Sequence, residues 1–480
     1  MDGFSIEVIE RLPLAESVTL LFRSIANEEL LAEIWEDKRA RCYEKLISFP
    51  VMVHLISDAL LTSKSGRQSF RKNKELGILK ASLVAAYDKL ARIPIAVSQQ
   101  FLERATVVLR DAFPEWSTWK RPDSLQNFRI LYYDGKAVKR VAHRLKETRG
   151  VKGGLLGGRA LVAQDWETGM AIAMHGDPDG QANEIKHLGQ LVTRVREILP
   201  EPKLHVGDRA FCDLVRPRSF QESPGDHFLV RYHPKVTFHP DDAVVERCGV
   251  TSTGATYKES WGWLGSEKDA RRLYVRRIEI LRPDDEPVVL ITSLLDAAAY
   301  PAQDLLFIYR HRWGIEQIFQ QITEVFGLSQ LIGTTPKATL FQFAFCLLLF
   351  NMIQVIRGYV AQAQNCDPSE ISTELLFHDV EEELIAWNKL LTPEQTQKYF
   401  DSVPTIAHLK RRLTTLLKKR WSETWRSTPT QLVHNSIRNK RQKTHSSVHR
   451  LLFGVPTKKK RKNLAQRIKT NPSKPQPTRP

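Results

Sequence analysis

The sequence predicts an α/β fold: a mixed sheet with helices on both faces, interrupted by an all-β insertion and preceded by a helical N-terminal domain. Apolar residues recur at three- and four-residue steps between about residues 17 and 113, where glycine and proline are scarce. From residue 127 the patterns run strand, strand, strand, helix, strand, which requires hairpins and a crossover around one sheet. Residues 226–295 then carry only strand patterns.

The first segment, residues 1–125, is expected to form the helical domain. The stretches LLAEIWEDKRARCYEKLISF and LGILKASLVAAYDKLARI both place apolar residues at helical intervals. The stretch SFRKNKE, residues 69–75, lies between these two segments and is interpreted as a basic connector between helices.

The second segment, residues 126–225, is expected to hold the first part of the sheet. FRILYYDGKAV is a strand pattern that ends in a turn at Asp134-Gly135, and two more strand patterns follow, RALVAQDW and GMAIAMHG. The helical pattern NEIKHLGQLVTRVREIL then stops at Pro200. KLHVGDRAF is a short strand pattern that ends at Gly207-Asp208.

The third segment, residues 226–300, is expected to be the β-strand insertion, and residues 301–425 are expected to complete the sheet domain with helices. The first of these helices is predicted over 304–327 and an apolar one over 338–361. The run FAFCLLLF in the apolar helix is closely bracketed by polar residues, which indicates a buried helix that is too short to span a bilayer.

The last segment, residues 426–480, is a polycation. The chain has a formal net charge of +17, yet no acidic residue follows Glu423, and fifteen lysines and arginines lie beyond it. A polycation attracts a polyanion, and nucleic acid is the commonest one. A disordered tail that only improves solubility is the alternative, and KKKRK at 458–462 also resembles a nuclear-localisation string, a pattern that many nucleic-acid binders share.

The five cysteines are scattered and none forms a CxxC pair, which favours reduced thiols over a disulfide framework or a zinc site. The first residues, MDGFSIEVIERLPLAE, contain early acidic residues and no apolar signal core. We therefore expect a cytoplasmic protein, associated with the nucleoid of a bacterium, and no membrane partner.

Three carboxylates occupy informative places. Asp134 ends the first strand pattern, Asp208 ends the strand after the helix, and Glu316 lies on the first helix beyond the β block. Side chains at the ends of neighbouring strands converge on one edge of a sheet. Converging carboxylates favour hard cations such as Mg²⁺ or Mn²⁺, and two such ions can promote attack on a phosphodiester.

These three segments carry a resemblance to a known family. The stretch YRHRWGIEQIF matches the first three positions of the Tyr-x2-Arg-x3-Glu-x6-Lys signature through Tyr309, Arg312 and Glu316. ILYYDGKAV resembles the segment around the first catalytic Asp of that family, and VGDRAF resembles the segment around the second. The chain, over about residues 10–365, thus resembles a DDE transposase of the insertion-sequence-4 family, with an RNase H-like catalytic domain and an all-β insertion.

The resemblance implies an enzyme that binds the terminal inverted repeats of its own element, cleaves double-stranded DNA, and joins the freed 3′-hydroxyl to target DNA. The resemblance also implies cut-and-paste transposition, often through a hairpin at the transposon end. It further implies a homodimer in the synaptic complex and DNA binding by residues 1–125. Asp134, Asp208 and Glu316 would be the catalytic and metal-binding residues, with two Mg²⁺ ions per site and Mn²⁺ as a substitute.

One position departs from the signature, because Thr323 stands where the family has a Lys that contacts DNA near the cleavage point. Threonine can hydrogen-bond a phosphate but carries no charge. The departure keeps a second hypothesis open, an inactive derivative that still binds DNA. A plain nuclease on the same fold is a third hypothesis.

Further DNA-binding candidates are open to plainer explanations. Arg312 suits a phosphate clamp but could be a helix ion-pair partner of Glu316. Tyr309 could contact DNA or line the core, and Arg209 is a lower-ranked candidate. Trp261 and Trp263 could stack on a flipped base, or pack the insertion.

The carboxylates also have simpler interpretations when each is considered alone. Asp134 could serve turn chemistry, Asp208 could pair with its neighbour Arg209, and Glu316 could be a solvated helix residue. Rival acidic residues also occur, and they are Asp165, Asp177, Asp179, Glu184, Asp213 and Glu324. The order of the three motif segments favours the catalytic interpretation.

Overall fold

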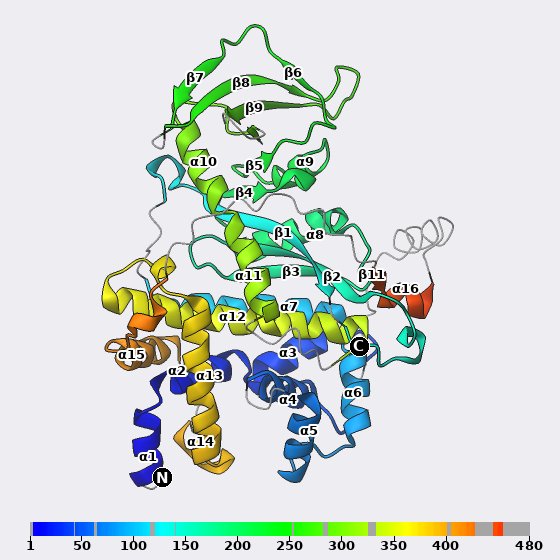
Figure 1. The fold of residues 1–480 in the computed structure, drawn as a ribbon, viewed down its shortest axis with the longest axis vertical. Coiled ribbons are helices and arrows are strands. Elements are labelled where there is room, and N and C mark those ends of the chain that lie inside the picture. Colours follow the sequence, from blue (N-terminus) through cyan, green and yellow to red (C-terminus); the bar gives the residue numbers. More distant parts are fainter. Residues whose placement is uncertain are drawn as a thin grey trace, which may run out of the picture.

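A computed structural model of the chain places a mixed sheet between a helical region and an all-β region (Figure 1). The structure describes residues 3–42, 44–61, 65–115, 121–139, 141–251, 254–281, 287–324, 333–400, 405–427 and 445–454.

Five strands form the core of the sheet: β1 (Arg129–Lys139), β2 (Gly154–Asp165), β3 (Ala171–Asp177), β4 (Lys203–Gly207) and β5 (His227–Arg231). Their order is β3-β2-β1-β4-β5. The first three are antiparallel neighbours, whereas β4 and β5 run parallel to β1. The predicted mixed sheet is therefore confirmed.

Helices cover both faces of this sheet, as predicted. Side chains alternate along β1, so that Ile130 and Tyr132 belong to one hydrophobic cluster while Leu131 and Tyr133 belong to the other. The second cluster packs under α8 (Leu188–Ile198), the crossover helix between β3 and β4.

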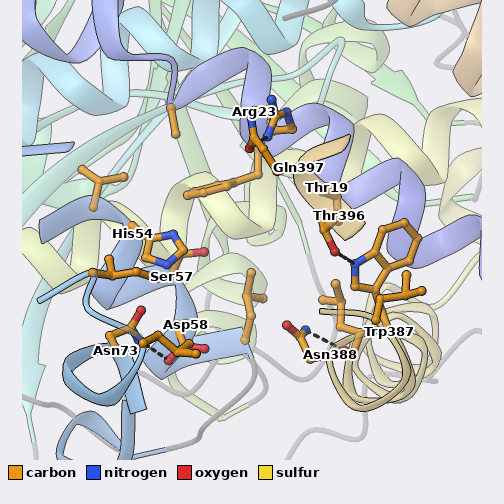
Figure 2. A pocket seen from close by; sticks show the side chains of 18 of the residues that line it. Thr19, Arg23, His54, Ser57, Asp58, Asn73, Trp387, Asn388, Thr396 and Gln397 are labelled. Atoms are coloured by element: carbon orange, nitrogen blue, oxygen red, sulfur yellow. Dashed lines mark hydrogen bonds between the residues drawn. The ribbon is translucent and has the colours of Figure 1, made fainter. Parts of the chain in front are cut away.

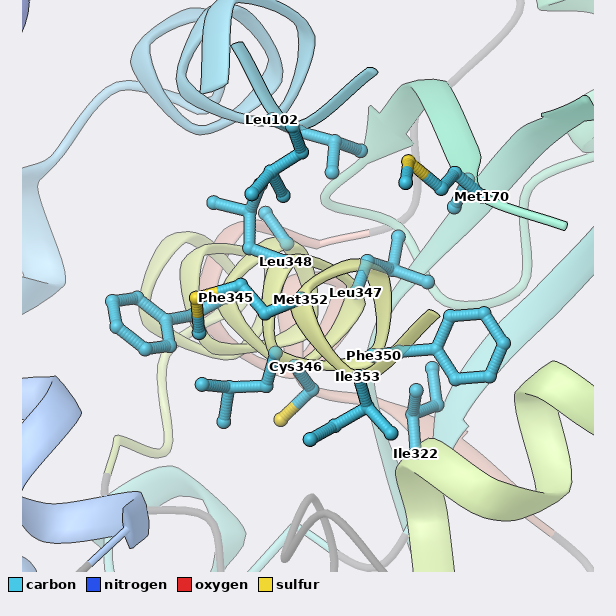
Figure 3. Close-up of a cluster of buried hydrophobic side chains, with 14 of the residues drawn as sticks. Leu102, Met170, Ile322, Phe345, Cys346, Leu347, Leu348, Phe350, Met352 and Ile353 are labelled. Carbon is cyan, nitrogen blue, oxygen red and sulfur yellow. The ribbon is translucent and has the colours of Figure 1, made fainter. Parts of the chain in front are cut away.

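The first cluster packs against the long helices α7 (Ile95–Ala112) and α12 (Pro336–Gln364). Helix α12 is long and apolar enough to cross a membrane by length and composition, but its most apolar stretch is entirely buried inside the protein. Figure 3 shows Phe345, Leu348 and Ile353 pointing in different directions from α12 into the surrounding core. The prediction that this apolar run is a buried helix is confirmed, because the helix is apolar all round.

The N-terminal helices share this core with helices from the C-terminal half. Glu383 of α13 (Thr373–Leu390) accepts hydrogen bonds from the backbone N–H groups of Leu14 and Ala15, at 2.7 and 3.1 Å. These N–H groups lie in the first turn of a helix, which has no partners for them of its own. The helices of the region are α1 (Gly3–Glu10), α2 (Pro13–Ile25), α3 (Glu28–Lys38), α4 (Phe49–Leu61), α5 (Gly66–Glu75), α6 (Leu83–Arg92), α14 (Pro393–Tyr399) and α15 (Ile406–Leu417).

The helical N-terminal region is therefore confirmed, while its boundary at residue 125 stays a prediction. One local prediction was wrong. Residues 69–75, expected to be a connector, lie within helix α5, because Ser69, Phe70 and Asn73 form a buried stripe at helical spacing.

The all-β insertion extends the core sheet rather than forming a sheet of its own. It consists of β6 (Phe238–Pro240), β7 (Arg247–Val250), β8 (Thr256–Leu264), β9 (Leu273–Ile280) and β10 (Val288–Thr292). Strand β10 pairs with β5, and β9, β8 and β6 follow outward. The predicted start of the insertion at residue 226 precedes β5, which belongs to the core by its parallel pairing with β4.

The prediction that residues 426–480 form an unstructured tail was wrong for residues 445–454. Strand β11 (His445–Ser447) pairs in parallel with β2 at Gly154–Leu156, and α16 (Val448–Phe453) follows it. Arg450 forms an ion pair with Asp179 at 2.9 Å, and Val448 is fully buried. Residues 428–444 and 455–480 of the predicted tail lie outside the described residues.

Candidate active site

Strand register brings two of the three predicted carboxylates together. In the parallel pairing of β1 with β4, Tyr133 lies opposite Gly207, so Asp134 and Asp208 occupy the next position on each strand. Asp134 lies on the same face of β1 as Ile130 and Tyr132, because side chains alternate along a strand. Helix α11 (Trp313–Glu324) packs on β1.

The prediction that Asp134 lies in a turn was wrong. Strand β1 continues through it, with Asp134 opposite Val162 and Gly135 opposite Leu161 of β2. Because β4 ends at Gly207 while β1 continues, Asp134 sits where the sheet edge steps back. A Cβ at Gly135 would overlap the side chain of Glu184, so a larger residue here would require Glu184 to shift.

The predicted helix at 304–327 is interrupted. Helix α10 (Ala302–His311) ends at Arg312, α11 begins at residue 313, and residues 325–327 lie outside the described residues. The hydroxyl of buried Tyr132 donates a hydrogen bond to the backbone oxygen of Ile308 at 2.9 Å, which fixes α10 against β1. Glu316 follows in the first turn of α11.

Glu316 is held by the residue at the joint between these helices. Its Oε1 atom lies 3.0 Å from Nη2 of Arg312, whose side chain is 7% exposed against 39% for Glu316. The guanidinium of Arg312 lies 5.7 Å from the centre of the Tyr309 ring, and Tyr309 is itself 8% exposed. In this structure Arg312 is thus an ion-pair partner of Glu316, the plainer of its two interpretations.

The pKa of Asp134 is raised, mainly by burial. Together with the charges of Asp208 and Glu316, burial raises it to about 6, while the Gly135 N–H and Arg312 act in the opposite direction. The N–H of Gly135 donates to Asp134 Oδ1 at 2.8 Å. Burial and neighbouring negative charges make the ionised form of this carboxyl group unfavourable, and a bound cation would stabilise it.

The donor set therefore fits divalent cations in charge and in chemistry, since all three side chains offer carboxylate oxygens. The three residues do not bring one oxygen each within 4.8 Å of one another. Within the described residues such a close group of potential ligands consists of His378, Asp379 and Glu382 on α13, all from one helix face near the surface. Glu316 instead lies against Arg312.

The remaining predicted residues occupy varied places. Arg209 is exposed directly beside Asp208, whose side chain accepts a hydrogen bond from the Ala210 N–H at 2.8 Å. The Thr323 hydroxyl donates to the backbone oxygen of Phe319 at 2.6 Å. Thr323 lies about two turns beyond Glu316, on the same side of α11.

The two tryptophans pack the insertion. Trp261 is 8% exposed and its Nε1 atom donates to the backbone oxygen of Leu295 at 2.8 Å. The Arg272 guanidinium lies 4.1 Å from the centre of the half-buried Trp263 ring, which also contacts Tyr274 edge-on. The alternative interpretation holds for Trp261, because a buried ring has no free face for a base.

The structure also reveals a residue that the sequence analysis missed. Lys136 lies on the same face of β1 as Asp134, and its Nζ atom is 5.5 Å from the centre of the Phe319 ring on α11. Phe319 is one turn beyond Glu316 and accepts the Thr323 hydrogen bond. The alternation of β1 could have indicated Lys136, had Asp134 not been assigned to a turn.

Comparisons with known proteins concern the region that holds this site. A family model described as "Transposase DDE domain" matches residues 128–352, a range that contains β1, β4 and α11. A solved structure titled "Cryo-EM structure of piggyBac transposase synaptic complex with hairpin DNA (SNHP)" is similar with a TM-score of 0.39 and 10% identity, covering 86% of this chain and 88% of that chain. No curated protein matches the sequence. The family match supports a DDE transposase, and Asp134, Asp208 and Glu316 all lie within the matched residues.

Proposed function

We propose that the protein is a metal-dependent transposase of the insertion-sequence-4 family. It would bind the inverted repeats at the ends of its element, cleave the DNA and join the ends to a target. The observation that carries this proposal is the parallel register of β1 and β4, which brings Asp134 and Asp208 to the same end of neighbouring strands. The charge of Glu316 is close enough to raise the pKa of Asp134.

Asp134, Asp208 and Glu316 are proposed to hold two Mg²⁺ ions, with Mn²⁺ as a substitute. When bound, such ions polarise a phosphodiester and lower the pKa of an attacking water or 3′-hydroxyl. The protein residues supply the ligands and orient them. The ion pair with Arg312 would orient the Glu316 carboxylate.

The protein must also hold a DNA backbone beside these carboxylates, and this requires positive charge. Arg209 is exposed next to Asp208 and is suited to a phosphate contact. Arg312 would contribute positive charge beside Glu316, and Tyr309 lies beside Arg312. For Trp263 a DNA contact would require Arg272 to leave its ring.

Lys136 is proposed to supply the cation that the signature lacks at Thr323. Both residues flank Phe319, one from β1 and the other from α11. A lysine at either place would present an ammonium group to the same region of the site. Lys136→Gln should therefore reduce cleavage, and Thr323→Lys in the same chain should restore it.

A second candidate function is that of an inactive derivative which retains DNA binding. The observation in its favour is Thr323, whose hydroxyl is engaged with its own helix and which carries no charge. If this candidate is right, wild-type protein binds end DNA without cleaving it, and Thr323→Lys alone produces cleavage.

The remaining parts of the proposal follow from the resemblance. A homodimer would join two ends in a synaptic complex, and cleavage would proceed by a cut-and-paste route, often through a hairpin. Residues 1–125 would recognise the ends, and the basic residues beyond 426 would add nonspecific affinity. The protein would act in the bacterial cytoplasm, at the nucleoid.

The test is a cleavage assay with purified protein, Mg²⁺ or Mn²⁺, and a duplex that carries the DNA flanking the gene. We expect nicking that needs the metal and is lost in Glu316→Gln, with retained binding in a gel-shift assay. Asp111→Asn, an exposed change on α7, is the matched control and should cleave like wild type.

Further outcomes separate the alternatives. Cleavage without joining to a target plasmid would indicate a plain nuclease. Cleavage that persists in both Asp208→Asn and Glu316→Gln would refute the assigned site.

A further inference from the structure

Helices α4 and α5 are consecutive and pack against each other in the helical region. Four residues, 62–65, separate them in the sequence. Many DNA-binding proteins present the second of two such closely spaced, packed helices to DNA.

One side of α5 is fastened to α4. The hydroxyl of Ser69 donates to the backbone oxygen of Leu55 at 3.1 Å, and Asn73 Nδ2 donates to Asp58 Oδ2 at 3.0 Å. Phe70, between them, is fully buried and lies 5.0 Å from the Tyr87 ring of α6 between ring centres. These contacts hold the orientation of α5 and leave its opposite side outward.

The outward side is basic and its charges are largely uncompensated. Helix α5 carries four cations, at Arg67, Arg71, Lys72 and Lys74, against the single acid Glu75. Within the described part of the chain Lys72 lies 3.8 Å from Asp58, whereas Arg67, Arg71 and Lys74 form no ion pair.

Helix α15 is also basic, and it provides a contrast. Two arginines in and beside α15 are used within the protein: Arg412 binds Glu16 at 2.7 Å and Arg420 binds Glu383 at 2.6 Å. Their role is to join α15 to α2 and α13. Among the described residues Arg67, Arg71 and Lys74 of α5 form no such ion pair, so their charge is available to a partner outside the chain.

A hollow of about 930 Å³ lies beside the α4–α5 pair and separates it from α13 and α14 (Figure 2). Asp58 and Asn73 line one wall, and Trp387 and Thr396 line the other. Helix α5 lies at the end of the molecule away from the insertion (Figure 1). Its basic side chains, Arg67, Arg71, Lys72 and Lys74, are exposed.

We propose that α5 is the DNA-recognition helix of this protein, an inference that rests on the proposed transposase function. Arg67 and Gln68, at the start of the helix, read base edges in the major groove, where Arg pairs with guanine and Gln with adenine. Arg71 and Lys74 lie about one and two turns further along and hold backbone phosphates. Duplex DNA fits because the exposed side offers charge, hydrogen-bond donors and helical shape together.

The experiment is a binding selection with the full chain and a pool of duplexes that contain a randomised 20-base-pair segment. Three double variants accompany wild type. Arg67→Ala/Gln68→Ala removes the proposed base contacts, and Arg71→Gln/Lys74→Gln removes the proposed phosphate contacts. Lys418→Gln/Lys419→Gln, exposed beyond the end of α15, is the matched control for the loss of two charges.

Wild type should enrich one sequence motif. Arg67→Ala/Gln68→Ala should lose discrimination at one or two positions of that motif by roughly tenfold or more. Arg71→Gln/Lys74→Gln should weaken binding to motif and unrelated duplexes alike, and lower the slope of log affinity against log salt by about 2. The control pair should retain the motif and affect affinity less.

The inference is overturned if Arg67→Ala/Gln68→Ala enriches the same motif with unchanged affinity, or if the control pair weakens binding as much as Arg71→Gln/Lys74→Gln. These results leave the transposase proposal intact. A wild-type protein that binds no duplex, or enriches no motif, refutes that proposal together with the recognition helix.

Discussion

Asp134→Asn should stabilise the metal-free protein, although the change removes a proposed catalytic residue. Burial and the charges of Asp208 and Glu316 raise the pKa of Asp134 to about 6, from an ordinary value of 3.8. A folded-state pKa above the unfolded one means that the ionised carboxylate opposes folding. The asparagine amide has the same shape, can keep the Gly135 N–H bond through its oxygen, and carries no charge.

The magnitude follows from the pKa difference of about two units, which corresponds to about 3 kcal/mol at most. This destabilisation is fully present above pH 6, where Asp134 is ionised in both states. It declines as the pH falls through 6 toward 3.8, and it vanishes when both states are protonated. Asp134→Asn should thus gain up to about 3 kcal/mol at pH 8 and clearly less at pH 5.

The assay is urea unfolding in the presence of EDTA at pH 8 and pH 5, repeated at pH 8 with Mn²⁺ in place of EDTA. With Mn²⁺ the order should reverse, because the ion stabilises the wild-type site by binding the folded state. Asp111→Asn, at an exposed position, should change stability by less than about 0.5 kcal/mol. Two results would show that the Asp134 carboxylate does not oppose folding. One is an Asp134→Asn protein that is less stable than wild type at pH 8 without metal. The other is a difference in the free energy of unfolding that is the same at pH 8 and pH 5.

Three other results are expected. The pKa of fully buried His205 is lowered by burial to about 4, so its contribution to stability is present above pH 6.5 and is lost as the pH falls toward 4; urea unfolding should show a loss of about 2 kcal/mol at pH 5 that His205→Gln lacks. Arg276→Met should destabilise by about 3–5 kcal/mol in thermal melts, because it leaves buried Glu259 without its partner at 2.8 Å, and Arg276→Met/Glu259→Leu should recover most of that loss. A chain that ends at Gly454 should keep β11 and α16 but bind all duplexes more weakly and with a flatter salt dependence, whereas loss of one motif alone would show that residues 455–480 read sequence.

The sequence was sufficient for the core of the fold because each element carries its own period. Strand alternation, the helical spacing of α8 and the order of these patterns define a mixed sheet with little freedom. The carboxylates were predicted for the same reason, since Asp208 follows a strand directly and Glu316 lies on the first helical pattern beyond the β block.

Asp134 shows what local pattern could not settle. Asp-Gly is a strong turn signal, yet β1 continues through Asp134 and Gly135. Strand β2 pairs with β1 from Leu131 to Lys139, on both sides of this dipeptide. The pairing partner lies more than 25 residues away, and local propensity cannot describe it. The same cause hid Lys136, which joins the site only if the strand continues.

The ends of the other elements failed for a similar reason. Strand β5 was grouped with the insertion, since its sequence resembles the strands that follow; only its parallel partner β4 distinguishes it. Strand β11 has three residues inside a basic segment, and it exists because the edge of β2 offers unpaired backbone groups beyond β3. Composition describes the whole segment and misses such a short ordered part.

Anomalous scattering from crystals soaked with Mn²⁺ would show whether Asp134, Asp208 and Glu316 bind divalent cations. We expect peaks between these three residues, with the Glu316 carboxylate turned from Arg312 toward the ions. The same crystals of Glu316→Gln should lose at least one peak. Mn²⁺ bound at His378, Asp379 and Glu382 instead, with no peak beside Asp134, would show that Asp134, Asp208 and Glu316 are not the metal site.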